Sequence, residues 1–131
     1  MRAKLRDLKP KIITIDKKDH HCLPTQYKDY FATTLGHIVS TKLTKPIVLK
    51  PWVNDNGYLL VQICRKNIRV HRLVAETFLE SPATDKDASK RLEVNHIDGN
   101  KVNNKVANLE WNSQAENRLH HQMFKELFQC V

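Results

Sequence analysis

Alternation of apolar and polar residues predicts a β-hairpin near the middle of the chain. In GYLLVQI, the residues Leu59, Val61 and Ile63 recur at every second position, which is the pattern of a half-buried strand. The polar RKN that follows favours a hairpin turn, and IRV favours the return strand. Such a hairpin presents three basic residues around its end: Arg65, Lys66 and Arg69.

Shorter apolar runs predict further strands in the first fifty residues. KIITID (11–16) is a β-branched run in a polar and basic segment, and it suits an edge strand. GHIVS (36–40) and PIVLK (46–50) are short runs bounded by glycine and proline. These runs indicate small antiparallel strands.

A short helix is predicted directly after the hairpin, over HRLVAETFL (71–79). Four of its residues share one face at 3.6 residues per turn, and we expect that face to pack in the core: Leu73, Val74, Thr77 and Phe78. The following ESPATDKDASK (80–90) is polar, contains a proline and lacks periodicity. It is predicted to be a surface loop.

The segment after this loop predicts two strands joined by a turn. RLEVNH (91–96) is a strand that ends at a histidine, and NLEWN (108–112) is the second strand. Between them, Asp98 and Gly99 supply the chemistry that lets the chain reverse its direction.

A capping box predicts a helix after the second strand. Ser113 and Glu116 form the box, and the helix extends to about residue 129. Asn117 lies opposite the apolar stripe of this helix, and His121 follows Asn117 by one turn. The stripe consists of Ala115, Leu119, Met123 and Leu127.

The charge of the chain favours a polyanionic partner. The 131 residues carry a net charge of +8, with a pI near 9.5. Residues 1–50 hold 11 Lys and Arg against 4 Asp and Glu, a net +7, whereas residues 51–131 hold 11 against 10, a net +1. Nucleic acid is therefore the expected partner, and the basic half is expected to contact it.

The sequence indicates a protein that acts in the cytoplasm. It contains no apolar run long enough to span a bilayer and no signal-peptide pattern, so no membrane association is expected. The three cysteines are far apart and form no CxxC pair, as expected of reduced intracellular thiols. A zinc site at Cys22, His20 and His21 would have a spacing that no common zinc module uses.

Residues 92–117 combine one histidine with seven asparagines. Asparagine is a poor helix former, and it is common in loops because it tolerates left-handed backbone and hydrogen-bonds neighbouring amides. Asn100, Asn103 and Asn104 are expected to do no more than this.

Asn95 and His96 differ from the loop asparagines because they end an apolar strand beside the predicted helix that carries Asn117. Amide oxygens suit a hard cation such as Mg²⁺, and a neutral imidazole is a suitable base near pH 7. This combination favours metal-assisted cleavage of a phosphodiester bond. The hypothesis requires the imidazole of His96 to be accessible to water.

The segment VNHIDGNKVNNKVANLEWNSQAENRLHH closely resembles the HNH nucleases, specifically the small phage and intron homing endonucleases. The preceding YLLVQICRKNIRVHRLVAETFL also resembles the corresponding part of those proteins, so the likeness covers residues 56–121. The resemblance implies an α+β fold in which small antiparallel strands accompany a ββα-metal motif. Residues 56–131 would form the HNH nuclease domain, and residues 1–55 a basic N-terminal region that contacts DNA.

The resemblance assigns roles to three residues around the predicted strand end. His96 matches the general base of the family, and Asn95 and Asn117 match the two positions that bind Mg²⁺ or Mn²⁺. Some relatives have aspartate or histidine where this chain has Asn95. A neutral amide lacks the charge attraction of a carboxylate, so metal affinity or rate is expected to be lower.

Further roles follow from the same resemblance. Asn108 matches the central asparagine, which steadies the loop and helps to orient the base in the family. His121 matches a second helical histidine that lies near the phosphate in some relatives, and His120 is its alternative.

The expected substrate is double-stranded DNA, cleaved in the cytoplasm of the host cell if the gene belongs to a phage. Two further arginines could reach a phosphate, although both are also ordinary surface charges: Arg72 and Arg118. The N-terminal region or a partner protein would direct the enzyme to its target. The alternative is a non-catalytic DNA-binding module that retains the HNH scaffold.

Overall fold

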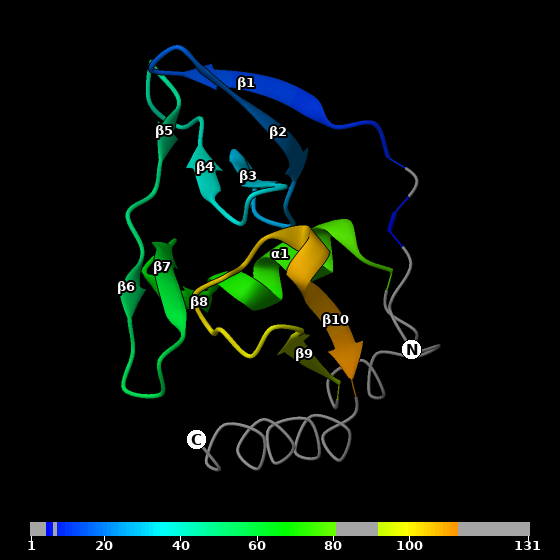
Figure 1. The fold of residues 1–131 in the computed structure, drawn as a ribbon. Helices are drawn as coiled ribbons and strands as arrows, with labels where there is room; N and C mark the ends of the chain where they lie inside the picture. Colours follow the sequence, from blue (N-terminus) through cyan, green and yellow to red (C-terminus); the bar gives the residue numbers. More distant parts are fainter. Residues whose placement is uncertain (1–4, 7, 81–91, 113–131) are drawn as a thin grey trace, which may run out of the picture.

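The computed structural model describes residues 5, 6, 8–80 and 92–112, and all structural statements below concern these residues. The fold is α+β, with small antiparallel sheets around one helix (Figure 1). The predicted loop at 80–90, apart from its first residue, and the predicted helix from Ser113 onward lie outside the described residues.

The N-terminal half forms a five-stranded antiparallel sheet in the order β1-β2-β3-β4-β5. Its strands are β1 (Lys11–Ile15), β2 (Lys18–Pro24), β3 (Tyr30–Thr33), β4 (Ile38–Ser40) and β5 (Ile47–Val48). The run KIITID forms β1 and occupies an edge of the sheet, as predicted. β2 and β3 were not predicted, because polar residues such as His20 occupy inward-facing positions and disguise the alternation.

A three-stranded sheet follows, and it leads directly into the helix. The sheet contains β6 (Trp52–Val53), β7 (Leu59–Ile63) and β8 (Lys66–Arg69), and the helix is α1 (Val70–Phe78). The hairpin was predicted correctly, but its turn lies at Cys64 and Arg65 rather than at RKN. Both turn residues have positive φ, at 51° and 66°, which is the backbone of a two-residue hairpin turn.

The last described elements form a two-stranded antiparallel sheet that packs on α1. β9 (Glu93–His96) pairs with β10 (Leu109–Asn112), and the short 3₁₀ helix η1 (Val106–Asn108) precedes β10. Both strands were predicted from the sequence. In Figure 1, α1 lies between the N-terminal sheet on one side and the β9–β10 pair on the other.

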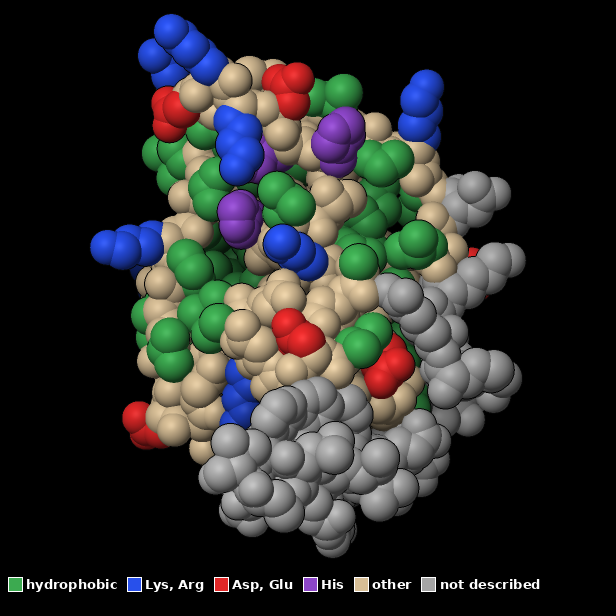
Figure 2. Space-filling model, in the orientation of Figure 1, with side chains coloured by type: hydrophobic (Ala, Val, Ile, Leu, Met, Phe, Trp, Pro, Cys, Tyr) green, Lys and Arg blue, Asp and Glu red, His purple; other side chains and the backbone are tan. Residues whose placement is uncertain are grey.

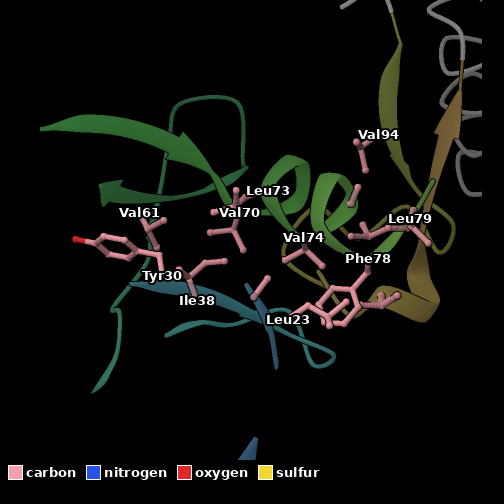
Figure 3. Packing of buried hydrophobic residues seen from close by; sticks show 14 of the residues in the cluster. Leu23, Tyr30, Ile38, Val61, Val70, Leu73, Val74, Phe78, Leu79 and Val94 are labelled. Atoms are coloured by element: carbon pink, nitrogen blue, oxygen red, sulfur yellow. The ribbon is translucent and has the colours of Figure 1, made fainter. Parts of the chain in front are cut away.

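The hydrophobic core surrounds α1 and joins all parts of the fold. Side chains of α1 pack between Leu23 and Ile38 of the N-terminal sheet on one side and Val94 of β9 on the other (Figure 3). All four residues of the predicted apolar face of α1 are buried. Each large aliphatic side chain buried in this way contributes roughly 1.5–3 kcal/mol to stability. The core therefore contains residues from both sides of residue 55, where the sequence predicts a functional boundary. That boundary stays a prediction.

The turn between β3 and β4 lies against the loop that precedes η1. Gly36 has φ +88°, and a Cβ atom added to it would lie 2.4 Å from both the carbonyl carbon and the oxygen of Asn104. The backbone N–H of Val106 donates to the carbonyl of Thr34 at 3.0 Å. Only glycine fits this turn, because its neighbour is backbone, which cannot move aside like a side chain.

We predict that Gly36→Ala destabilises the protein strongly. Left-handed backbone costs about 1–2 kcal/mol with a Cβ atom, and forced overpacking adds about 1–3 kcal/mol, so we expect a loss of about 2–5 kcal/mol. Gly57→Ala is a matched control, because Gly57 has φ +87° but its added Cβ would meet only Lys101 Cδ, at 3.4 Å. Urea unfolding of both variants measures the difference. Equal losses would show that the contact with Asn104 imposes no steric cost.

Candidate active site

The β9–β10 hairpin presents Asn95 and His96 on opposite faces. Successive side chains of a strand alternate, so Val94 and His96 share one face and Asn95 has the other. The ring of His96 lies 5.1 Å from that of His71 on α1, which places the His96 face toward the helix. Asn95 pairs with Glu110 across the sheet, and both side chains therefore lie on the face away from α1.

Asn108 fastens the loop between β9 and β10. Its Oδ1 accepts a hydrogen bond from the backbone N–H of Asp98 at 3.0 Å. Its Nδ2 donates to Asp98 Oδ1 and to the carbonyl of Asn103, both at 2.9 Å. These contacts are those of a residue that steadies the loop, and the catalytic role of Asn108 stays a prediction.

Hydrogen bonds converge on the Asp98 carboxylate in the same loop. Burial acts to raise the pKa of Asp98, but hydrogen bonds from Asn103, Asn100 and Asn108, together with the charge of His96, outweigh it and lower the pKa. The carboxylate therefore remains charged and keeps the loop fastened.

His96 is held by Asn104, which sequence reasoning had assigned only to the loop. The distance between His96 Nε2 and Asn104 Oδ1 is 2.7 Å, and the two side chains are 4% and 3% exposed. An amide oxygen only accepts, so Nε2 carries the proton and Nδ1 has the lone pair of a base. The expectation of an accessible imidazole is not met, since the ring is buried by the surrounding protein.

Aromatic rings surround His96 on the helix side. The rings of Tyr58 and His71 stack with their centroids 4.8 Å apart, and Tyr58 lies 6.1 Å from His96. Burial, followed by the charges of His96, Arg69 and Arg72, lowers the pKa of His71 from 6.5 to about 3. His71 is therefore neutral near pH 7, and it places no positive charge beside the ring of His96.

Asn95 has one anchored and one unpartnered end. Its side chain is 1% exposed, and Nδ2 donates to Glu110 Oε1 at 2.9 Å. Its Oδ1 is buried and has no hydrogen-bond partner in the structure described here. A buried oxygen without a partner is costly unless a ligand satisfies it, and amide oxygens are ligands that Mg²⁺ accepts. Asn95 thus fits the predicted metal position.

The predicted DNA-contacting residues differ in exposure and in the contacts that their side chains already make. Arg65, Lys66 and Arg69 are exposed around the β7–β8 hairpin. Arg72 is half-buried and engaged, because it pairs with Glu76 at 3.0 Å, donates to the carbonyl of Leu92 at 3.1 Å and lies over the Trp111 ring. On the face shown in Figure 2, the Lys and Arg side chains are spread out rather than gathered in one patch.

Several predicted site residues cannot be placed. Asn117, Arg118, His120 and His121 lie outside the described residues, so the convergence of the helix on Asn95 and His96 stays a prediction. Among the residues that are described, no group of three or more His, Cys, Asp or Glu side chains could hold a metal ion. The described part of the chain also has no helix with the length and apolar character needed to cross a bilayer.

Comparison with known proteins gives relatives of one kind. An uncharacterized HNH endonuclease of Acanthamoeba polyphaga mimivirus is 38% identical over 110 residues, which is 80% of this chain and 31% of that protein. A protein of the SPbeta prophage of Bacillus subtilis, named as an HNH homing endonuclease, is 41% identical over 96 residues, which is 70% of this chain and 51% of its own length. No protein-family model matches the chain.

A solved structure of the HNH homing endonuclease I-HmuI, which binds and cleaves DNA, shares the fold. It superposes with a TM-score of 0.59 and 31% sequence identity, over 76% of this chain and 54% of that chain. The chain thus spans about half or less of the length of these relatives.

We predict that acid destabilises the fold partly through His71. Between pH 6.5 and about 3, the unfolded chain binds a proton at this residue that the folded chain does not. The free energy of unfolding therefore falls with the pH, by at most about 1.4 kcal/mol per pH unit from this group. His71→Phe keeps a stacked ring without the titration, so its urea-unfolding free energies should decline less between pH 7 and pH 4.5. Parallel curves for the two proteins would contradict this.

Proposed function

Because this chain belongs to the HNH endonuclease family, we propose that it is a DNA endonuclease that hydrolyses phosphodiester bonds with the help of one divalent cation. The observation that carries the proposal is the buried, unpartnered Oδ1 of Asn95. The next residue of the same strand, His96, has its imidazole held by Asn104. The names of the relatives support a homing-type enzyme of phage origin that acts on DNA. The proposal takes double-stranded DNA as the substrate and the cytoplasm of the host cell as the place of action.

We propose that Asn95 and Asn117 hold Mg²⁺ or Mn²⁺. Asn95 fits this role because its oxygen is buried, unpartnered and of the type that hard cations prefer. When bound, the cation would offset the negative charge that develops on the phosphate and on the leaving 3′ oxygen. A site with two neutral amides binds the cation weakly on its own, so the phosphate of the substrate is expected to complete it.

His96 acts as the general base in this proposal. Its Nδ1 takes a proton from a water molecule while the oxygen of that water attacks phosphorus. The bond from phosphorus to the 3′ oxygen breaks, and the 3′ oxygen takes a proton from the solvent. The products carry 5′-phosphate and 3′-hydroxyl ends. Asn104 keeps the proton on Nε2. Because His71 is neutral, it does not repel the positive charge that forms on His96 in this step. His121, or His120 in its place, is proposed to assist near the phosphate.

The exposed basic residues of the β7–β8 hairpin are proposed to contact DNA phosphates, together with Arg118 and the N-terminal region 1–55. Such contacts supply affinity and carry little sequence information. Arg72 is a weaker candidate, because its guanidinium already binds Glu76 and Leu92. Target choice then rests on the N-terminal region or on a partner protein.

One observation favours a second function, that of a DNA-binding module without catalysis. The His96 side chain is only 4% exposed, whereas a base must reach a water molecule. In this alternative, the hairpin and its stacked rings serve the fold alone.

Plasmid nicking in Mg²⁺ or Mn²⁺ separates the two functions. We expect the wild type to cleave and His96→Ala to lose about 10²–10⁴-fold in rate, because general-base catalysis contributes that much. Gln62→Ala, at an exposed position of β7, is the control. Equal cleavage by wild type and His96→Ala would remove His96 from the mechanism. DNA binding without cleavage by the wild type would favour the binding module.

We also predict that Asn104 acts through the orientation of His96. Loss of its amide in Asn104→Ala should lower the single-turnover cleavage rate by about 10–100-fold, the range seen when an outer partner of a site residue is removed. DNA affinity, measured by gel shift in Ca²⁺, should not change. Asn104→Asp retains an acceptor for Nε2 and should keep more activity.

Asn100→Ala is the matched control for Asn104. Asn100 lies in the same loop, is exposed, and its Oδ1 accepts from the backbone N–H of Val102. Unchanged cleavage by Asn104→Ala would show that the contact with His96 does not serve catalysis.

A further inference from the structure

Asn95 and Glu110 form a directed pair across the β9–β10 hairpin. The two residues are register partners, and Asn95 Nδ2 donates to Glu110 Oε1 at 2.9 Å. The same carboxylate oxygen also accepts from Asn112 Nδ2, at 3.3 Å. Glu110 is half-buried, and the Asn95 side chain is enclosed.

This pairing fixes which end of the Asn95 amide is available. A carboxylate accepts hydrogen bonds and cannot donate them, so only the NH₂ end of the amide can face Glu110. The oxygen must then point the other way, and it is this oxygen that is buried without a partner. Without Glu110 the amide could turn over and present NH₂, which no cation accepts.

The pairing also bears on why this strand end has an amide rather than a carboxylate. An aspartate at position 95 would bring a second carboxylate against Glu110 at hydrogen-bond distance, where like charges repel. With asparagine at position 95, the negative charge of the pair lies on Glu110, the cross-strand partner of the proposed ligand.

We propose that Glu110 is a positioning residue of the metal site, which locks the Asn95 amide with its oxygen toward the cation and supplies the negative charge that Asn95 lacks. This inference rests on the proposed function, in which Asn95 is a metal ligand. Outer residues of this kind typically change metal affinity by about 10–100-fold.

The first experiment tests the pair without metal, through thermal unfolding in EDTA. We expect Asn95→Asp to lower Tm because two carboxylates then meet. Adding Glu110→Gln should recover most of that loss, because the new amide at 110 can donate to the new carboxylate at 95. If the change in Tm of the double variant equals the sum of the changes in the two single variants, the two side chains are not coupled, and the inference is overturned.

The second experiment measures Mn²⁺ affinity by calorimetry on folded variants. We expect Glu110→Ala to weaken binding by about tenfold or more. Glu110→Gln, which keeps an acceptor for Nδ2 but loses the charge, should weaken it less. Asp19→Asn is the charge control, because Asp19 accepts from Thr14 in the β1–β2 hairpin, at the opposite end of the fold from β9 and β10 (Figure 1).

Asn95→Ala separates failure of the inference from failure of the proposed function. If Asn95→Ala weakens Mn²⁺ binding and both Glu110 variants bind like wild type, Glu110 has no positioning role and the metal site stands. If neither Asn95→Ala nor Glu110→Ala changes the affinity, the metal site itself is wrong and the inference falls with it. Should Glu110→Ala fail to fold, Glu110→Gln and the double variant decide the outcome.

Discussion

The contact between Gly36 and the backbone of Asn104 is the constraint on which the site depends. It brings a turn of the N-terminal sheet against the loop between β9 and β10 at a distance that excludes any side chain. The same loop carries the amide that holds His96 Nε2. Because the contact is backbone against glycine, the loop cannot shift without losing it, and the position of the imidazole therefore depends on packing about sixty residues away in the sequence.

The two faces of the β9–β10 hairpin have different tasks. On the face toward α1, the ring of His96 lies near those of Tyr58 and His71. Burial and nearby positive charges lower the pKa of His71 and keep it neutral. On the other face, Asn95 is oriented by Glu110. The uncharged imidazole of His71 on one face and the carboxylate of Glu110 on the other therefore give two adjacent residues of one strand opposite electrostatic surroundings.

The sequence predicted the elements that have clear periodicity and missed those whose signal depends on partners. α1, β7, β9 and β10 were predicted because their apolar spacing is regular. β2 was missed because His20 occupies an inward position. The hairpin turn was misplaced because Cys64 and Arg65, which have positive φ, are not residue types that indicate such a turn. The family resemblance singled out Asn95 and His96 as candidate site residues, and their roles stay predictions. The contacts that Asn104 and Glu110 make with them depend on loop packing and cross-strand register, which no local sequence pattern predicts.

The shared core around α1 has a consequence for how the gene of this protein can evolve. The stretch that carries the HNH signature begins after residue 55, yet Leu23 and Ile38 pack against its helix and Gly36 supports its loop. A recombination event that moved the signature stretch alone into another gene would separate it from the N-terminal residues that pack against its helix and its loop. Exchange between genomes is therefore expected to preserve the two halves as one inherited unit, with variation accumulating at exposed hairpin ends.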